Sequence, residues 1–545
     1  MTVKLTDLPA EVVNRIIARC MDHRRLEPES HHGLDHNGLG PIPQRPRPHR
    51  EDNPPYLYPR TISEMMRSPQ LPYQVSWPEG LPSNPLVVLS LVSRTFRQCA
   101  QKELFSNVCL SDRCQAYLFI RVLTCPSTAQ REPASPSAPL NGQPKHNAPE
   151  APLEIVQPSE INRRVVNKLA QHVRSIQFNP RSMGLGGGSL ICDVLHCCPL
   201  LENIAISMKI FESCREPILK ALERQPLIKE FVTLESYGQV NTTVLQWKAD
   251  EVVNRLFPKW KSLETIEFND LSFSRPVATI DSIPEPIPVL NCALRTIILK
   301  SPELDERELS WLLKTYSESI RTLKIIHPSK KLDRTGLCRI LQECTGPNLE
   351  SLTLKVDTSW HPIKPSSKMI QKKHLDNPAK NQGLLDIVFR SSSALRNLKS
   401  LSLAGNLVGA DCLSLLPESL VKLALDDFQM LALAFTQLIL SRLTGKDDGE
   451  SAPEPHHSQP DSHSDQPFQW LPNLQCCSIA DWPRKEWKIV SKALEARGVC
   501  CHSDYNSDCS SESDQGESED SSDESQEQEN SSNEQEGSSD EEGDS

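Results

Sequence analysis

The sequence of 545 residues has no hydrophobic run long enough to cross a membrane. Its longest apolar stretch, Phe428 to Leu440, is interrupted by polar residues and is shorter than the ~18 residues that a membrane span needs. The N-terminus has no apolar core segment and no cleavage site, so no secretory signal peptide is predicted. These absences favour a protein of the cytoplasm, the nucleus or both, with no membrane partner.

The eighteen cysteines form no C-x-x-C pair. The adjacent pairs Cys197-Cys198, Cys476-Cys477 and Cys500-Cys501 do not have zinc-ligand spacing. Reduced thiols are expected without a signal peptide, and several are expected to be small buried groups in repeat helices: Cys192, Cys197, Cys338, Cys344 and Cys412. Local sequence suggests no Ser/His/Asp or Cys/His set. We therefore predict no metal, no cofactor and no catalytic residue.

One glycine-rich loop, Gly184–Ser189, follows a predicted strand and precedes a predicted helix. This is the context of a dinucleotide-binding loop, but the third glycine is missing and no Lys-Ser/Thr follows as in a P-loop. A strand-to-helix turn also favours glycine for steric reasons. An enzyme that uses this loop is therefore an alternative, and a structural turn is the simpler interpretation.

The net charge of −12 is concentrated at one end of the chain. Residues 503–545 contain seventeen Asp and Glu, fourteen Ser and no Lys or Arg. The rest of the chain contains 59 basic and 54 acidic residues, so its net charge is about +5. We predict a disordered acidic, Ser-rich tail over 503–545. Composition also predicts a disordered insertion over 21–84, a Pro-rich linker over 126–158 and insertions at about 358–383 and 445–467.

A six-residue phrase recurs between these segments: apolar, charged, Ser/Thr/Asn, Ile/Leu, any residue, apolar. Clear copies start at residues 173, 201, 263, 294, 320, 349 and 398, with weaker copies at 228, 420 and 474. A phrase repeated every twenty to thirty residues indicates a stacked solenoid. Because side chains alternate along a strand, offsets 4 and 6 should point inward and offsets 3, 5 and 7 outward. Each repeat cannot bury its apolar side alone, so the repeats should share one core.

The copy at 398 continues through Gly405-Asn406 and completes L-x-x-L-x-L-x-x-N. Here the chain resembles the leucine-rich-repeat family. The resemblance implies an α/β fold, a horseshoe-type solenoid over 165–500 that presents a surface for another macromolecule.

The N-terminal region has two halves, 1–20 and 85–110. The first contains Leu8-Pro9-Ala10-Glu11 before an apolar helical stripe, and the second contains an apolar run followed by Val92-Ser93-Arg94-Thr95-Phe96. In this order the halves resemble the F-box, which has L-P-x-E and then V-S/C-R-x-F/W. Residues 21–84 stand where that family has a short loop, but the cost of closing a loop grows slowly with its length, by about 0.6 kcal/mol per doubling.

An F-box ahead of leucine-rich repeats implies the substrate receptor of a cullin–RING ubiquitin ligase, which performs no chemistry itself. The F-box would contact a Skp-type adaptor, and we assign that contact to Leu8, Pro9, Val12, Ile16, Leu89, Val92 and Phe96. The alternative is a ligase-independent leucine-rich-repeat scaffold in which the N-terminal helices only cap the solenoid.

The repeat strands would bind the protein substrate. Lys300, Lys324 and Lys355 occupy outward offsets on three successive strands, about 5 Å apart from one strand to the next. They predict a site for an acidic or phosphorylated protein, for which the tail 503–545 would compete as a tethered ligand. Ordinary solvated lysines are the simpler explanation of these three residues. No nucleic-acid partner is expected.

Overall fold

The computed structural model describes residues 8–25, 85–110, 113–124, 168–178, 188–207, 212–234, 245–274, 292, 294–363, 377–379, 383–391, 395–409, 411–426, 436–437, 470–479 and 484–502. The predicted linker 126–158, insertion 445–467 and acidic tail 503–545 lie outside these ranges, as does most of the predicted insertion 21–84.

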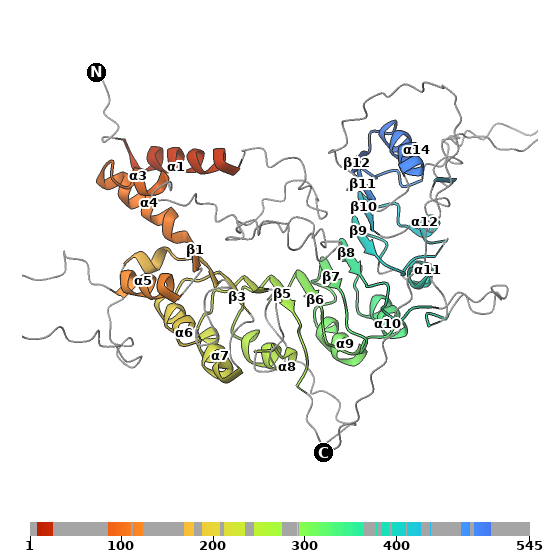
Figure 1. Cartoon of the computed structure of the whole chain (residues 1–545), viewed down its shortest axis with the longest axis horizontal. Helices are drawn as coiled ribbons and strands as arrows, with labels where there is room; N and C mark the ends of the chain where they lie inside the picture. The colour runs from red at the N-terminus through yellow and green to blue at the C-terminus, as the bar shows by residue number, and fades with distance from the viewer. Residues whose placement is uncertain are drawn as a thin grey trace, which may run out of the picture. The chain divides into compact units, whose positions relative to one another are not determined.

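Twelve parallel strands form one sheet in which each strand pairs with the next in chain order (Figure 1). The strands are β1 (Asn107–Leu110), β2 (Ser175–Phe178), β3 (Asn203–Ser207), β4 (Glu230–Leu234), β5 (Thr265–Asn269), β6 (Thr296–Lys300), β7 (Thr322–Ile326), β8 (Ser351–Lys355), β9 (Ser400–Ala404), β10 (Lys422–Asp426), β11 (Cys476–Ile479) and β12 (Cys500–His502). This order, without a single crossover, is that of a solenoid. The predicted α/β solenoid is confirmed.

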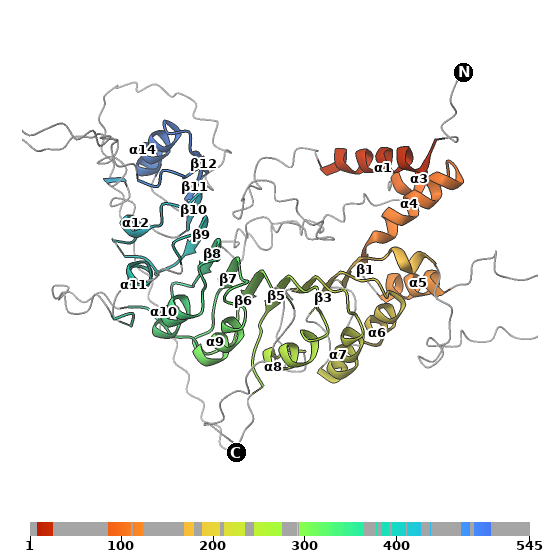
Figure 2. The ribbon, with the colours of Figure 1, turned by 180° about the vertical axis from the view of Figure 1, so that it is seen from behind.

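Helices connect the strands and lie along one side of the sheet, as both views show from α5 to α11 (Figures 1 and 2). They are α5 (Arg113–Thr124), η4 (Lys168–His172), α6 (Gly188–Cys197), η5 (Glu212–Cys214), α7 (Arg215–Glu223), α8 (Ala249–Glu251), the π-helical turn η6 (Val252–Leu256), α9 (Glu306–Lys314), α10 (Arg334–Glu343), α11 (Leu384–Ser391), α12 (Cys412–Leu415) and α14 (Arg484–Glu495). At α9 and α10 the N-cap carboxylates of Asp305 and Asp333 accept the free N–H groups of Glu308 and Gly336. At α9 the Glu308 side chain returns a bond to the Asp305 N–H and completes a capping box.

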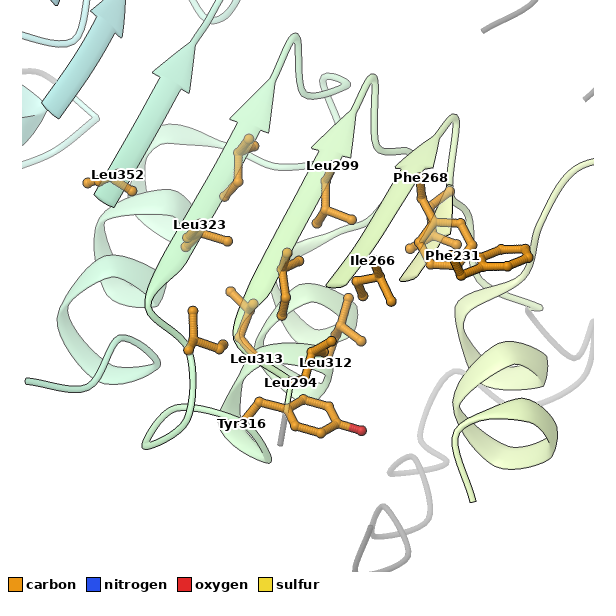
Figure 3. Close-up of a cluster of buried hydrophobic side chains, with 14 of the residues drawn as sticks. Phe231, Ile266, Phe268, Leu294, Leu299, Leu312, Leu313, Tyr316, Leu323 and Leu352 are labelled. Carbon is orange, nitrogen blue, oxygen red and sulfur yellow. The ribbon is translucent and has the colours of Figure 1, made fainter. Parts of the chain in front are cut away.

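The inward offsets of the repeated phrase build the core. Offsets 4 and 6 are fully or almost fully buried in every clear copy, for example Ile266 and Phe268 in β5 or Leu352 and Leu354 in β8. Figure 3 shows such side chains reaching from the strands toward Leu312 and Leu313 of α9. The alternation predicted from the sequence is confirmed, and so are the buried positions of its five named repeat cysteines.

Aromatic side chains fill the core beside β4 and β5. The Phe231 ring lies 5.2 Å from Trp247, 5.3 Å from Trp260 and 5.5 Å from Phe268. Trp260 has no exposed surface, and its Nε1 donates to the Leu222 carbonyl oxygen at 3.2 Å. This arrangement satisfies the indole N–H while burying the largest side chain of the region.

The solenoid begins earlier than the predicted residue 165. β1 pairs in register with β2, from Asn107 opposite Ser175 to Leu110 opposite Phe178, although the predicted linker separates them in the sequence. The segment Phe105 to Leu110 fits the repeated phrase at its apolar positions and its Asn, but its spacing hides the match. The last strand, β12, lacks the phrase and was not predicted.

One further expectation needs correction. Trp360 lies within the predicted insertion of about 358–383, yet it is buried and belongs to the main core, and its Nε1 donates to the Ser329 carbonyl oxygen at 3.4 Å. Asn406, the last position of the nine-residue phrase, is exposed, and its carbonyl oxygen accepts from Arg334 Nη1 at 2.8 Å.

Candidate protein-interaction surfaces

The two halves of the N-terminal motif pack together as three helices, α1 (Ala10–Arg25), α3 (Pro85–Leu89) and α4 (Arg94–Ser106), which we call the three-helix cluster. Its core contains one or more residues from each helix: Val13, Ile17, Leu86, Phe96, Cys99 and Ala100. Cys99 Sγ also contacts the Ala10 carbonyl oxygen at 3.9 Å. The residues between α1 and α3 therefore do not prevent the halves from meeting.

The start of α4 follows from the sequence. Ser93 is its N-cap, with extended backbone, and its hydroxyl accepts the Phe96 N–H at 3.3 Å. An N-cap residue has non-helical backbone, so the chain changes direction at Ser93 before the helix begins. This turn places Phe96 on the side of α4 that packs against α1, where only 1% of its surface is exposed.

The seven residues assigned to the adaptor contact lie at different depths. Phe96 is a core residue and is not available on the surface, because it fills the contact between helices. Pro9 and Val12 are exposed, and the remaining four pack partly buried against the core: Leu8, Ile16, Leu89 and Val92.

Two exposed apolar residues of the cluster were missed. Val88 is 54% exposed and Leu91 is 74% exposed, beside Val12 at 40%. The signal was present in the sequence, because the apolar run from residue 86 to 92 covers more than one face of a short helix. A helix packed on one side cannot bury such a run, so part of it must face outward.

The cluster continues directly into the solenoid. α4 ends at Ser106 and β1 begins at Asn107, and the Ser106 carbonyl oxygen accepts the Arg174 N–H at 3.0 Å. α4 therefore joins the three-helix cluster directly to the first strand of the sheet.

The outward face of the sheet consists of rows of register partners. One row contains mainly small polar residues, among them Ser175, Thr265, Thr296, Thr322, Ser351 and Ser400. Several positions on this face are nevertheless buried, including Ser351, Thr353 and Ser402. Neighbouring strands lie about 4.8 Å apart, so small side chains are flanked on both sides by their register partners. Small outward residues are thus less accessible than the alternation alone suggests.

The three predicted lysines do not form one row. Lys324 is the register partner of Ile298 and Thr353, whereas Lys300 and Lys355 both flank Ile326 on the next row. Lys300 Nζ lies 3.0 Å from Glu267 Oε1, and Lys355 Nζ lies 3.8 Å from Asp426 Oδ2. Ile298, a register partner of Lys324, is only 1% exposed. The expected basic patch is therefore a mixed surface with acidic partners.

A hollow of about 300 Å³ lies beyond the carboxyl ends of β5 to β8. His327 Nδ1 lies 2.7 Å from Asp357 Oδ1 there, and Lys331 Nζ lies 3.3 Å from Glu303 Oε2 beside it. The residues directly after β5, β6 and β7 have positive φ, and each donates its N–H to the last carbonyl of the next strand. These main-chain hydrogen bonds fix the backbone that lines the hollow at this edge of the sheet.

The described residues contain no group of three or more His, Cys, Asp or Glu side chains able to hold a metal ion. No described helix is both long and apolar enough to span a membrane. In the glycine-rich segment Gly184–Ser189, residues 184–187 lie outside the described ranges, and Gly188 and Ser189 begin α6.

No protein-family model matches the chain, and no curated protein matches it. Among solved structures, a similar chain is found in the crystal structure of the TLR13–ssRNA13 complex, with 13% identity and a TM-score of 0.26. The match covers 58% of this chain and 42% of that chain, so it spans less than half the length of this neighbour. The fold assigned to this chain rests on its own repeats and strands. It is an α/β solenoid with a leucine-rich-repeat sequence pattern.

Proposed function

We propose that this protein is the substrate-recognition subunit of a cullin–RING ubiquitin ligase of the SCF type. The observation that carries this proposal is the three-helix cluster, in which motif halves separated by residues 21–84 share one apolar core. The cluster leaves Val12, Val88 and Leu91 exposed. Apolar side chains gathered on such a small unit favour burial by a partner, and the motif resemblance names a Skp-type adaptor.

The protein would have no catalytic role in this assembly. Binding a substrate beside a ubiquitin-charged enzyme converts a bimolecular transfer into a nearly intramolecular one. The solenoid suits the binding part of this task, because its sheet offers a long face of register-aligned side chains on a rigid core.

The substrate would be a protein with an acidic or phosphorylated segment that contacts Lys324 and its neighbours. Glu267 and Asp426 hold Lys300 and Lys355 in the free protein, so an acidic partner would compete with these carboxylates. Phosphate, with more charge and more acceptor oxygens, competes better than a single carboxylate.

Co-expression with a Skp-type adaptor tests the proposal. The wild-type chain should co-purify with the adaptor, and the double variant Val12→Asp/Leu91→Asp should not, because a buried unpaired carboxylate opposes the interface. Leu227→Asp and Ile489→Asp are matched controls, since these apolar residues are 37% and 47% exposed in the solenoid. Adaptor binding that survives the double variant would contradict the assignment of this surface.

A ligase-independent scaffold is the second candidate. The continuation of α4 into β1 favours it, because a cluster joined directly to the first strand could serve as the N-terminal cap of the solenoid. In that case the wild-type chain would fail to bind the adaptor, while deleting the cluster would lower the stability of the solenoid. Adaptor binding and the stability of the solenoid without the cluster therefore distinguish a ligase subunit from a ligase-independent scaffold.

A further inference from the structure

The last two strands of the sheet bring four cysteines into register. Cys476 of β11 is the partner of Cys500 of β12, and Cys477 is the partner of Cys501. The pairs lie on opposite faces of the sheet, because side chains alternate along each strand. Cys477 is fully buried on the core side, while Cys476 is half-buried and Cys500 is exposed on the outward face.

The spacing of adjacent strands is compatible with a disulfide between the outward pair. Adjacent strands are about 4.8 Å apart, and disulfides join Cα atoms about 4.4–6.8 Å apart. The two thiols also contact each other as hydrogen-bonding partners. The strands are held in register by the main chain, where the Cys500 N–H donates to the Gln475 carbonyl oxygen at 2.8 Å.

The surroundings of the pair give the two thiols different roles. Burial, and then the contact with Cys500, raises the pKa of Cys476 to about 12. Lys422 is the register partner of Cys476 on the other side, and its charge favours the thiolate. Cys500 is on the terminal strand and is reachable from solvent, so it is the thiol that an oxidant meets first.

We propose that Cys476 and Cys500 form a redox-active dithiol, which a low-molecular-weight disulfide oxidises to an intramolecular disulfide that links β12 to β11. The inference does not depend on the ligase assignment.

The chemistry balances in two exchange steps. The Cys500 thiolate attacks one sulfur of the disulfide RS–SR, which forms Cys500–S–SR and releases RS⁻. Cys476 loses its proton to solvent and attacks the Cys500 sulfur, which forms the Cys476–Cys500 bond and releases the second RS⁻. Both protein thiols are oxidised, and RS–SR is reduced to two thiols.

The pair is distinct among the described cysteines. Cys192, Cys338 and Cys412 are buried where a soluble oxidant cannot reach them, and burial raises the pKa of each thiol. Cys114 is exposed, but a thiol on one helix face has no register partner to resolve a mixed disulfide. An accessible attacking thiol beside a resolving thiol is the arrangement of a redox-sensing pair.

Oxidation should change the end of the solenoid. The bond would close a loop that contains α14 and would prevent β12 from separating from β11. Amide exchange of residues 500–502 should slow by about tenfold or more, because opening of the terminal strand would no longer expose them.

Treatment of the full reduced chain with oxidised glutathione, followed by intact-mass and cross-link mapping, tests the proposal. The product should be two hydrogens lighter, with a dithiothreitol-reversible link between the segments that contain residues 476 and 500. The link should be lost in Cys476→Ser and in Cys500→Ser. It should persist in Cys477→Ala and Cys501→Ala, which separate the outward pair from the inward one.

Three results would overturn the proposal: a link that survives Cys476→Ser, a glutathione adduct on Cys500 that never resolves, or a disulfide between two chains. Cys477→Ala removes a buried group and can unfold the edge. The outward-face variants Cys476→Ser and Cys500→Ser do not depend on Cys477→Ala. Together with slowed amide exchange at 500–502 in the oxidised wild type, they test whether the disulfide forms.

Discussion

The three-helix cluster and the solenoid bury their apolar residues in different ways. The cluster closes around six buried side chains and leaves Val12, Val88 and Leu91 exposed beside them. The solenoid core runs without interruption from Leu110 to Val499, and polar contacts tie its repeats together. A small core with exposed apolar neighbours is typical of a unit whose apolar surface is buried by a binding partner, whereas a large continuous core is stable without one.

The largest expected effect is on the solenoid core. Trp260→Ala should lower the free energy of unfolding by about 4 kcal/mol, because it leaves a cavity beside the Phe231 and Phe257 rings and removes the donor to the Leu222 carbonyl oxygen. Denaturant unfolding followed by circular dichroism measures this loss. Ile489→Ala, on an exposed site of α14, should change stability by less than about 0.5 kcal/mol. Equal losses in the two variants would mean that the aromatic residues are not a stabilising centre.

The next effect tests whether the cluster is a separate unit. Phe96→Ala should cost about 3 kcal/mol locally, because Phe96 joins α1 to α4. Hydrogen exchange should then accelerate in α1 and α4 while β5 to β8 remain protected. If β5 to β8 lose protection as well, the two cores unfold as one, and the comparison drawn above fails.

A third, smaller effect concerns the hydrogen bonds that join different repeats of the solenoid. Arg334 is buried, which lowers its pKa to about 10, and it donates from Nε to the Pro378 carbonyl oxygen at 3.1 Å and from Nη1 to that of Asn406 at 2.8 Å. Arg334→Met keeps an unbranched apolar stem but leaves both acceptors without this donor, so a loss of about 2 kcal/mol is expected. Arg339→Met, which removes only the exposed ion pair with Glu306, should cost less than about 1 kcal/mol; denaturant unfolding of both variants measures the difference.

The smallest effect depends on pH. Burial raises the pKa of Asp386, even though its carboxylate accepts the Gly409 N–H at 2.9 Å. A pKa that is higher in the folded state means that the stability contributed by this group is present at low pH and is lost as pH rises through the folded pKa. Asp386→Asn should therefore gain stability relative to the parent chain as pH rises above about 4, the ordinary pKa of an aspartate. Unfolding midpoints of both proteins are measured as pH is raised above this value, with the surface variant Glu318→Gln as control. A difference between Asp386→Asn and the parent chain that does not change with pH would refute the prediction.

The sequence predicted more of the solenoid than of its surfaces. Ile266, Phe268, Leu352 and Leu354 were assigned to the core from their offsets alone, and all are buried. β1 was missed because the chain between it and β2 hides the repeat spacing. Ser is a residue type favoured at helix N-caps, and the Ser93 hydroxyl does cap α4.

The candidate sites depended on features that the sequence pattern does not contain. The three lysines occupy outward offsets as predicted, but the strand register places Lys324 on a different row from Lys300 and Lys355. Glu267 pairs with Lys300, and Asp426 pairs with Lys355. Similarly, the adjacent cysteines were interpreted only as poor zinc ligands. Pairing of β11 with β12 is what places Cys476 beside Cys500.

The sequence by itself determined which side chains of each repeat face the core, because alternation along a strand is a local property of the backbone. It also placed the two halves of the N-terminal motif in order. Only the tertiary structure decided which residues of different repeats become neighbours, since strand register depends on main-chain hydrogen bonds across connections of unequal length. The same long-range packing brought Phe96 onto α1 and left Val88 and Leu91 exposed, so the surfaces proposed for binding are products of the fold.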